Sequence, residues 1–303
     1  MLKRLLFQAF RPGVGRLRGY PPRVPDLREC GSDLPNMDFR PTKITIVVPS
    51  RNQGQFLGAT IRSILDQAYP NLELIVVDGA STDNSVSVIK AYESHLSWWV
   101  SEPDDGQAAA INKGFSRATG DIMAWINSDD LVAPFALWRV ARFFQDNPAA
   151  EMVYGNRLLI DEVGNEIGKW ILPGHSHKVL KWADFVPQET LYWKREFWNS
   201  IGGKLDEAYN FALDWEFLLR SSSKNVDVRH LPIVLGMFRV HESQKTSSKI
   251  SSVGLREMNQ LRLRELGFEP SPLLVSFRLV PFLLSARWLE LRRNFGFRLR
   301  RRN

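Results

Sequence analysis

Cysteine is almost absent from this chain of 303 residues, which contains only Cys30. A single cysteine excludes an intramolecular disulfide framework and a cysteine-based zinc site, and it fits a reducing compartment. Three glycine-based motifs are absent as well: G-x-x-x-x-G-K-[ST], G-x-G-x-x-G after a strand, and G-x-S-x-G. Their absence argues against a P-loop ATPase, a dinucleotide-binding enzyme and a nucleophilic hydrolase.

A long uninterrupted hydrophobic run is also absent. The apolar stretch at residues 5–7 is too short for a secretory signal. Residues 272–291 are apolar-rich, but Arg278, Pro281 and Arg287 interrupt them. Since a spanning helix needs about 20 mostly apolar residues, we expect no transmembrane helix.

The same C-terminal stretch nevertheless has helical periodicity. Its apolar residues recur at spacings of three or four and would share one helix face: Leu273, Phe277, Val280, Leu284, Trp288 and Leu291. Such a face either packs on the domain or lies in a membrane interface. The arginine-rich tail that follows favours contact with an anionic membrane.

Positive charge is concentrated at the two ends of the chain. The net charge is +7, residues 1–28 carry +6 and residues 287–303 carry +6, so the middle is acidic. A basic body would have indicated a nucleic-acid groove. Basic ends instead suggest contact with an anionic surface, and we expect no nucleic-acid partner.

The residue pattern divides the chain into three parts. Residues 1–41 form a basic arm rich in proline and glycine, which we expect to have little regular structure. Residues 42–250 form one domain, with a first half at 42–130 and a second half at 131–250. Residues 251–303 form a helical basic extension.

Strands and helices alternate in the first half of the domain. Strands are expected at 44–48, 72–77 and 122–126, and helices at 55–67, from 81 onward and at 107–118. This rhythm predicts an α/β fold with a parallel sheet. The second half is less regular, with short strands at 152–154 and 158–160, a helix at 211–219 and a strand at 233–240.

Polar clusters follow three of the expected strands, at residues 49–52, 78–79 and 127–130. Ligands of such sheets bind beyond the carboxyl ends of the strands, so these clusters should meet in one crevice. Asp129 and Asp130 suit a hard divalent cation bound together with phosphate. The alternatives are a turn at Asp78 and a helix cap at Asp130, before a helix that starts near Pro134.

These segments resemble family 2 glycosyltransferases. The resemblance lies in residues 46–52, 63–67, 73–83, 102–107, 110–114, 119–122 and 124–130, in the family's order, and extends over about residues 43–245. It implies a GT-A fold, with a Rossmann-like, mostly parallel sheet and covering helices. It also implies inverting transfer from a nucleotide-diphospho-sugar, most often UDP-linked, with Mg²⁺ or Mn²⁺.

The resemblance assigns expected roles to individual positions. The expected donor-binding residues are Pro49, Ser50, Arg51, Asp78, Gln107, Lys113, Asn127 and Ser128. Asp129 and His241 would bind the metal, Asp214 would be the catalytic base, and Gln188 and Trp215 would face the acceptor. Asn127 departs from the family's aspartate, so metal binding would depend mainly on Asp129.

Other interpretations remain open from the sequence. Asp214 could be a surface carboxylate with Glu216 as the base, and His241 could be a core or surface histidine. A sugar-nucleotide nucleotidyltransferase is the alternative enzyme, although residues 50–54 contain one glycine and no lysine. A nucleic-acid-binding protein is a further alternative. We expect a cytoplasmic enzyme, peripheral on the inner membrane face, that acts on a saccharide or lipid-linked acceptor in polysaccharide biosynthesis.

Overall fold

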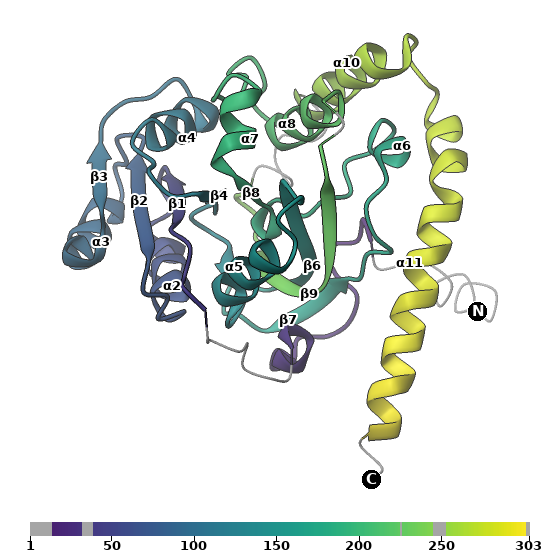
Figure 1. Ribbon diagram of the computed structural model, residues 1–303, viewed down its shortest axis with the longest axis horizontal. Helices are drawn as coiled ribbons and strands as arrows, with labels where there is room; N and C mark the ends of the chain where they lie inside the picture. The colour runs from purple at the N-terminus through teal and green to yellow at the C-terminus, as the bar shows by residue number, and fades with distance from the viewer. Residues whose placement is uncertain (1–13, 32–38, 225, 245–252, 301–303) are drawn as a thin grey trace.

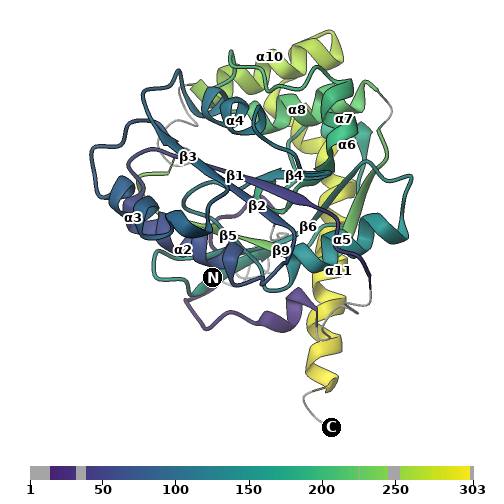
Figure 2. The ribbon, with the colours of Figure 1, turned by 60° about the vertical axis from the view of Figure 1, so that its left-hand side comes forward.

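The computed structural model describes residues 14–31, 39–224, 226–244 and 253–300 (Figure 1). Within these ranges the chain forms one mixed sheet of nine strands in the order β3-β2-β1-β4-β8-β6-β9-β5, with β7 beside β6. Helices cover both faces of this sheet (Figures 1 and 2). The α/β class predicted from the alternating pattern is therefore confirmed.

The first half contains four parallel strands and the helices that connect them. The strands are β1 (Ile44–Ser50), β2 (Leu72–Asp78), β3 (Trp98–Ser101) and β4 (Ile122–Trp125). The helical segments are α2 (Gly54–Leu65), α3 (Ser85–Ala91), η2 (Glu93–His95) and α4 (Gln107–Phe115). Ser50 pairs with Asp78 in the parallel register, so the carboxyl ends of β1 and β2 meet at one edge.

The second half adds shorter strands of both directions. Its strands are β5 (Leu131–Val132), β6 (Met152–Ile160), β7 (Glu166–Trp170), β8 (Tyr192–Lys194) and β9 (Val228–Arg239). Its helical segments are α5 (Ala136–Asp146), α6 (His177–Leu180), η3 (Gln188–Thr190), α7 (Arg195–Ser200) and α8 (Leu213–Ser222). Strand β8 lies antiparallel between β4 and β6, and this places η3 next to the end of β4.

Two short strands expected at 152–154 and 158–160 are in fact one continuous strand, β6. Gly155 does not end the strand; it lets β9 approach closely. A Cβ at this position would lie 2.7 Å from the carbonyl oxygen of Ile233 and 2.6 Å from Cγ of Leu235. The expectation of a break at Gly155 was therefore wrong.

The apolar core lies on both sides of the sheet. On one side, Leu57 and Ile61 of α2 and Leu137 of α5 pack against the strands. On the other side, Ile111 of α4 and Phe217 of α8 pack against a different set of strand side chains. Alternate side chains of the buried strands therefore pack against helices on opposite faces of the sheet. The polar residues lie at the sheet edge between these two helical layers.

The described segment of the basic arm, residues 14–31, packs on the domain. The backbone N–H groups of Gly19 and Tyr20 donate to the carbonyl of Ile167 at 2.7 and 3.1 Å, and Arg23 pairs with Glu166 through the backbone. The arm also contains the short helix η1 (Leu27–Cys30). The arm thus extends the edge of the sheet beside β7.

The described part of the C-terminal extension contains two helices, α10 (Leu255–Leu266) and α11 (Pro272–Arg300). The helix that the apolar periodicity of residues 273–291 predicts is therefore present, and it continues through Pro281. By length and composition alone, Pro272–Arg293 could cross a membrane. Length and composition do not decide whether this helix spans a membrane, so the absence of a transmembrane helix stays a prediction.

Candidate functional site

A cavity of about 270 Å³ opens where β4 ends, between the segment 184–189 and the start of α8. Six residues predicted from the sequence line it: Gln107, Asn127, Asp130, Gln188, Asp214 and Trp215. Asp130 was predicted within the Asp129–Asp130 pair, and the other five as donor, acceptor or catalytic residues. The structure therefore brings these residues from four separate segments into one cavity.

Amide side chains connect these segments across the cavity. Gln107 Nε2 donates to Asn127 Oδ1 at 2.7 Å, and Asn127 Nδ2 donates to Gln188 Oε1 at 3.1 Å. Gln188 Nε2 in turn donates to the carbonyl of Trp125 at 2.8 Å. Since buried polar groups need partners, this chain of hydrogen bonds fixes the orientation of Asn127 at the end of β4.

Asp130 is the buried carboxylate of the turn and does not cap α5. Its Oδ1 accepts the backbone N–H of Arg239 at 3.0 Å, and its Oδ2 accepts from Asn127 at 3.3 Å. Burial raises the pKa of Asp130 well above its usual range, and the neighbouring negative charges of Asp129 and Glu189 raise it further. The alternative interpretation as a helix cap was wrong, because α5 begins only at Ala136.

Asp129 and His241 form a separate pair on the other side of the turn. Asp129 Oδ2 lies 3.0 Å from His241 Nε2, and His241 Nδ1 lies 2.8 Å from the hydroxyl of Ser243. If Nδ1 of His241 donates its hydrogen to the Ser243 hydroxyl, Nε2 has a lone pair beside the carboxylate, as metal-binding histidines do. A carboxylate oxygen and an imidazole nitrogen this close in space fit a divalent cation.

This pair supplies few protein ligands. Among the described residues, no group of three or more His, Cys, Asp or Glu side chains is placed to hold a metal ion. A cation bound by Asp129 and His241 would therefore need most of its ligands from a bound substrate or from water. That is the usual situation for Mg²⁺, which keeps several waters and often shares phosphate oxygens.

The expected nucleotide-binding residues lie at the ends of β1 and β2. The carboxylate of Asp78 is buried and accepts hydrogen bonds from Ser81 N–H at 2.9 Å and Ser101 Oγ at 2.7 Å. The hydroxyl of Ser50 is buried without a hydrogen-bond partner in the described structure. Pro49 is buried beside it and the next residue, Arg51, is exposed. A buried, unpartnered hydroxyl at a strand end is a feature that a ligand would satisfy.

Two donor-site candidates take different positions. Ser128 is buried, and its carbonyl accepts the hydroxyl of Thr60 at 2.9 Å, which fixes the turn from α2. Lys113 lies away from the cavity, and its Nζ donates to Glu102 at 2.7 Å. The structure therefore does not bring Lys113 together with Gln107 at the cavity wall.

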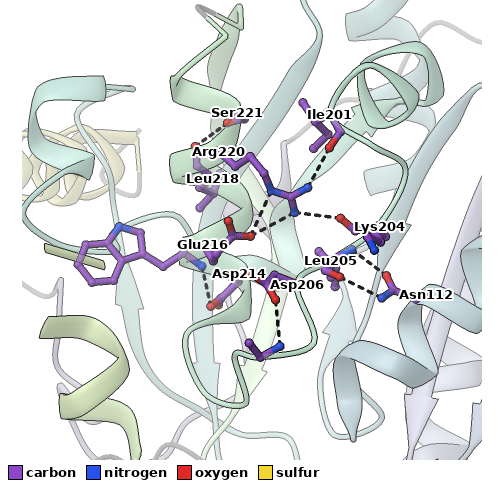
Figure 3. A network of polar contacts seen from close by, with 12 residues as sticks. Asn112, Ile201, Lys204, Leu205, Asp206, Asp214, Glu216, Leu218, Arg220 and Ser221 are labelled. Atoms are coloured by element: carbon purple, nitrogen blue, oxygen red, sulfur yellow. Dashed lines mark hydrogen bonds and ion pairs between the residues drawn. The ribbon is translucent and has the colours of Figure 1, made fainter. Parts of the chain in front are cut away.

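Asp214 and Glu216 occupy opposite sides of the first turn of α8 (Figure 3). Asp214 lines the cavity and accepts the backbone N–H of Trp215 at 2.9 Å. Glu216 points to Arg220 and Arg264, with contacts of 3.1 and 3.2 Å, and is 2% exposed. Only Asp214 of the two is therefore placed to act on a bound molecule.

Helix α10 holds the start of α8 in place. The carboxylate of Glu257 is buried and accepts three consecutive backbone N–H groups, from Asn210, Phe211 and Ala212, at 2.8 to 3.0 Å. These groups directly precede α8, where free donors need acceptors and a negative charge is favourable. Glu257 therefore fixes the backbone that carries Asp214.

Asp184 is a further carboxylate of this cavity, beside Asp130 and Asp214, and sequence reasoning missed it. Its side chain is exposed and lines the cavity, and its Oδ1 accepts the backbone N–H of Val186 at 3.3 Å. The protein atoms around this carboxyl raise the pKa of Asp184 above its usual range, and the charge of Asp214 raises it further. An aspartate in an irregular loop carries no local signal that separates it from a solvated one.

The wall opposite α8 contains a buried ion pair that was also missed. Arg157 Nε donates to Glu189 Oε1 at 2.8 Å, and the guanidinium lies between the rings of Trp170 and Phe238, at 4.6 and 4.5 Å. All four side chains line the cavity. The one feature of the sequence that could have indicated this pair is the position of Arg157 among the apolar residues of β6.

The arm completes this wall. Leu17 lines the cavity, and the carbonyl of Arg16 accepts the indole N–H of Trp170 at 2.8 Å. Trp215 closes the other side, with its indole N–H donated to the carbonyl of Leu180 at 2.8 Å. The cavity is thus bounded by indole rings whose polar atoms are already satisfied, and ring faces remain for contact.

The sequence of this region matches a known family. The model described as glycosyl transferase family 2 matches residues 45–203, which is more than half of the chain. An O-antigen biosynthesis protein of Myxococcus xanthus is 27% identical over 193 residues, 62% of this chain and 15% of that protein. Two further curated relatives, both named glycosyltransferases, match over 53% and 50% of their length, so the chain spans about half the length of these relatives.

Solved structures share the fold. S. aureus TarS in complex with UDP-GlcNAc superposes with a TM-score of 0.58 at 16% identity, over 74% of this chain and 71% of that one. A mannosyltransferase of Pyrobaculum calidifontis, in complex with GDP-Man and Mn²⁺, gives 0.59 at 20% identity, over 87% and 75%. The GT-A fold predicted from the sequence is confirmed.

Proposed function

Because the chain belongs to glycosyl transferase family 2, we propose that it is an inverting enzyme that transfers a sugar from a UDP-sugar to a saccharide or lipid-linked acceptor. The observation that carries this proposal is the cavity in which Asp214 lies with Gln107 and Asn127. Family membership favours this function over the nucleotidyltransferase and nucleic-acid-binding alternatives.

The donor would bind along the edge formed by the ends of β1, β2 and β4. Ser50, with its unpartnered hydroxyl, and the buried Asp78 would contact the nucleoside. Asp129 and His241 would hold Mg²⁺ or Mn²⁺, and the diphosphate would provide further ligands. When bound, the cation offsets the negative charge that develops on the departing diphosphate. TarS in complex with UDP-GlcNAc and the mannosyltransferase in complex with GDP-Man and Mn²⁺ support a nucleotide-sugar donor and a divalent cation for this fold.

Asp214 would act as the general base. It accepts the proton of the acceptor hydroxyl while that oxygen forms a bond to the anomeric carbon. The bond from this carbon to the diphosphate oxygen breaks on the opposite face, and the nucleoside diphosphate leaves with its electron pair. A single displacement needs no protein nucleophile and inverts the anomeric configuration, so one well-placed carboxylate is enough.

The cavity walls suit a saccharide acceptor. Five aromatic side chains line the space and offer flat apolar faces: Trp125, Trp170, Phe211, Trp215 and Phe238. Asp184 would exchange hydrogen bonds with hydroxyl groups of the acceptor. Gln188 is already held by Asn127 and Trp125, so we assign it to shaping the wall. The relative named for O-antigen biosynthesis supports a saccharide of the polysaccharide or lipid-linked class.

We place the reaction in the cytoplasm, at the inner membrane face. Cys30 is the only cysteine of the chain, and burial raises the pKa of its thiol to about 12. A chain without a disulfide framework is suited to a reducing compartment.

Calorimetry with UDP tests the donor site and its metal. We expect Mn²⁺ to tighten UDP binding at least about tenfold, and Asp129→Ala to abolish this gain, because the variant removes one of two protein ligands. Glu162→Ala removes an exposed carboxylate close to the turn and serves as the matched control. UDP affinity that is independent of metal in the wild type, or unchanged coupling in Asp129→Ala, would contradict the proposed site. A donor-hydrolysis screen over UDP-, GDP- and dTDP-sugars then identifies the donor.

A further inference from the structure

Helix α11 exposes a continuous row of large apolar side chains. The six residues of the stripe identified in the sequence are between 38% and 84% exposed: Leu273, Phe277, Val280, Leu284, Trp288 and Leu291. At roughly 100° per residue these positions fall within an arc of about 80°. Contiguous apolar surface of this kind marks a contact site for a partner or a membrane.

The opposite side of the helix holds α11 on the domain. Phe282 and Ala286 are buried, and the ring of Phe282 lies 4.6 Å from that of Phe185. Near the end of this segment, Arg293 donates to the carbonyl of Pro232 and lies 3.6 Å from Glu29 of the arm. The exposed row is therefore the face that remains after the helix has packed, and it is not a core face left open by a missing contact.

Arginine residues border the apolar row on both sides. On a helical projection Arg292 and Arg278 follow one edge of the arc. Arg287, which pairs with Glu290 at 2.9 Å, follows the other. Arg278 and Arg292 are exposed, and Arg278 lies over the ring of Trp182 at 5.3 Å. The sequence after Arg293 adds four more arginines and no acidic residue. Apolar residues between cationic edges are typical of helices that lie in the interface of anionic membranes.

We propose that α11 is a docking surface for an anionic lipid bilayer, lying in the plane of the interface with the row from Leu273 to Leu291 inserted. The arginines would contact lipid phosphates, and their long side chains can reach outward from the apolar region. A bilayer fits this surface better than a second copy of the chain, because two such faces would bring arginine edges together. A spanning orientation would require breaking the contacts of Phe282, Ala286 and Arg293.

This inference deepens the proposed function, on which it rests for the identity of the acceptor. Phe185, which stacks on Phe282, lies between Asp184 and Val186, and both of these line the cavity. The docked helix is therefore one residue away from the acceptor wall. A bilayer held at α11 would keep a lipid-linked saccharide close to the cavity.

Vesicle co-sedimentation with the full chain tests the proposal. The probes are vesicles of phosphatidylcholine alone and vesicles with 30% phosphatidylglycerol. The test variant is Phe277→Glu/Leu284→Glu, and the matched control is Val24→Glu/Val163→Glu, which changes two equally apolar, highly exposed positions (83% each) outside the helix. A second test variant, Arg278→Gln/Arg292→Gln, changes only the charge. Circular dichroism and thermal melting verify the folding of all variants.

We expect the wild type and the control to bind the anionic vesicles and to dissociate at high salt, because the attraction is screened. Binding should fall at least about tenfold in Phe277→Glu/Leu284→Glu, and about fivefold for each arginine removed. Equal binding to both vesicle types, or no change in either variant, overturns the proposal. Retention after an alkaline carbonate wash would instead indicate a spanning helix. If the wild type forms a dimer and does not bind vesicles, and only Phe277→Glu/Leu284→Glu dissociates this dimer, the occupant of the surface is a second copy of the chain.

Donor hydrolysis in solution keeps the two proposals separate. None of the three pairs of substitutions lies among the residues that line the cavity, so hydrolysis of the UDP-sugar should be unchanged in all variants. Vesicle binding without any donor turnover would leave the docking surface intact and contradict the enzymatic function. Normal turnover without vesicle binding would leave the enzymatic function intact and contradict the docking surface.

Discussion

The substitution Asp214→Asn separates the proposed catalytic base from its neighbour. Asparagine has the same shape and can keep the hydrogen bond from Trp215 N–H, which Asp214 accepts at 2.9 Å. It cannot take a proton from an acceptor hydroxyl. We therefore expect a folded protein with unchanged UDP affinity and a transfer rate about 10²- to 10⁴-fold lower, which corresponds to about 3 to 5 kcal/mol of activation free energy.

Glu216→Gln should give the opposite result. Glu216 is 2% exposed and pairs with Arg220 and Arg264, whose side chains are 25% and 40% exposed. Removing one partner of a fully buried ion pair costs about 3–5 kcal/mol. Because both arginines reach solvent here, the expected loss of unfolding free energy is smaller, about 1–3 kcal/mol. The transfer rate of the folded fraction should stay near that of the wild type.

Three measurements on both variants decide the assignment: transfer rate at saturating donor, UDP affinity by calorimetry, and stability by urea unfolding. Residues two apart on a helix point about 200° apart, so both carboxylates cannot face the same hydroxyl. Near-normal transfer in Asp214→Asn together with a large loss in Glu216→Gln would refute the assignment. So would a drop in UDP affinity that accounts for all of the lost rate in Asp214→Asn.

Two further predictions concern pH. Asp184→Asn should become progressively more stable than the wild type as pH rises above about 4. The reason is that the raised pKa of Asp184 makes the folded wild type hold a proton that the unfolded chain has released. A constant difference in melting temperature between the two proteins from pH 4 to 8 would contradict this. Burial opposes ionisation of Glu73, but hydrogen bonds from Thr119, Thr45 and Lys43 lower its pKa to about 2. Glu73→Gln should therefore cost about 1–3 kcal/mol at pH 7, and urea unfolding should show this cost vanishing as pH falls toward 2, where a persistent difference would exclude a role for the charge.

The first half of the fold could be predicted because its information is local. Strand β1 is a β-branched run closed by Pro49 and Ser50, and parallel strands place all their carboxyl ends at one edge. The polar clusters could therefore be brought together before any contact was known. Asp129 and His241, 112 residues apart, do lie 3.0 Å from each other as the resemblance implied.

The acceptor side could not be predicted in the same way. Strand β8 has three residues and pairs with β4 and β6, and a segment so short has no measurable period. Asp184 and Arg157 reach the cavity through this non-local pairing. Glu257 acts on the backbone before α8 from more than forty residues away. No local pattern distinguishes these charged residues from ordinary surface charges.

Helix α11 shows a different limit. The periodicity of its apolar residues correctly predicts one face, but the same period fits a face buried on the domain and a face left open. Which face is buried depends on where Phe282 and Ala286 find space beside Phe185, and that is a property of the tertiary structure. Helix α11 also continues through Pro281, because a proline removes one hydrogen bond without necessarily ending a packed helix.

Asn127 connects the sequence departure with the electrostatics of the cavity. The family's aspartate at this position would place a carboxylate against Asp130 and the amide oxygen of Gln188, both of which accept from Asn127 Nδ2. The cavity already contains the carboxylates of Asp130, Asp184, Glu189 and Asp214 against the single guanidinium of Arg157 among its lining residues. An amide supplies the donor that these acceptors need and adds no negative charge, while Asp129 lies outside this network beside His241. The loss of one charge in the motif thus avoids further repulsion among the carboxylates of the cavity and leaves the contact between Asp129 and His241 intact.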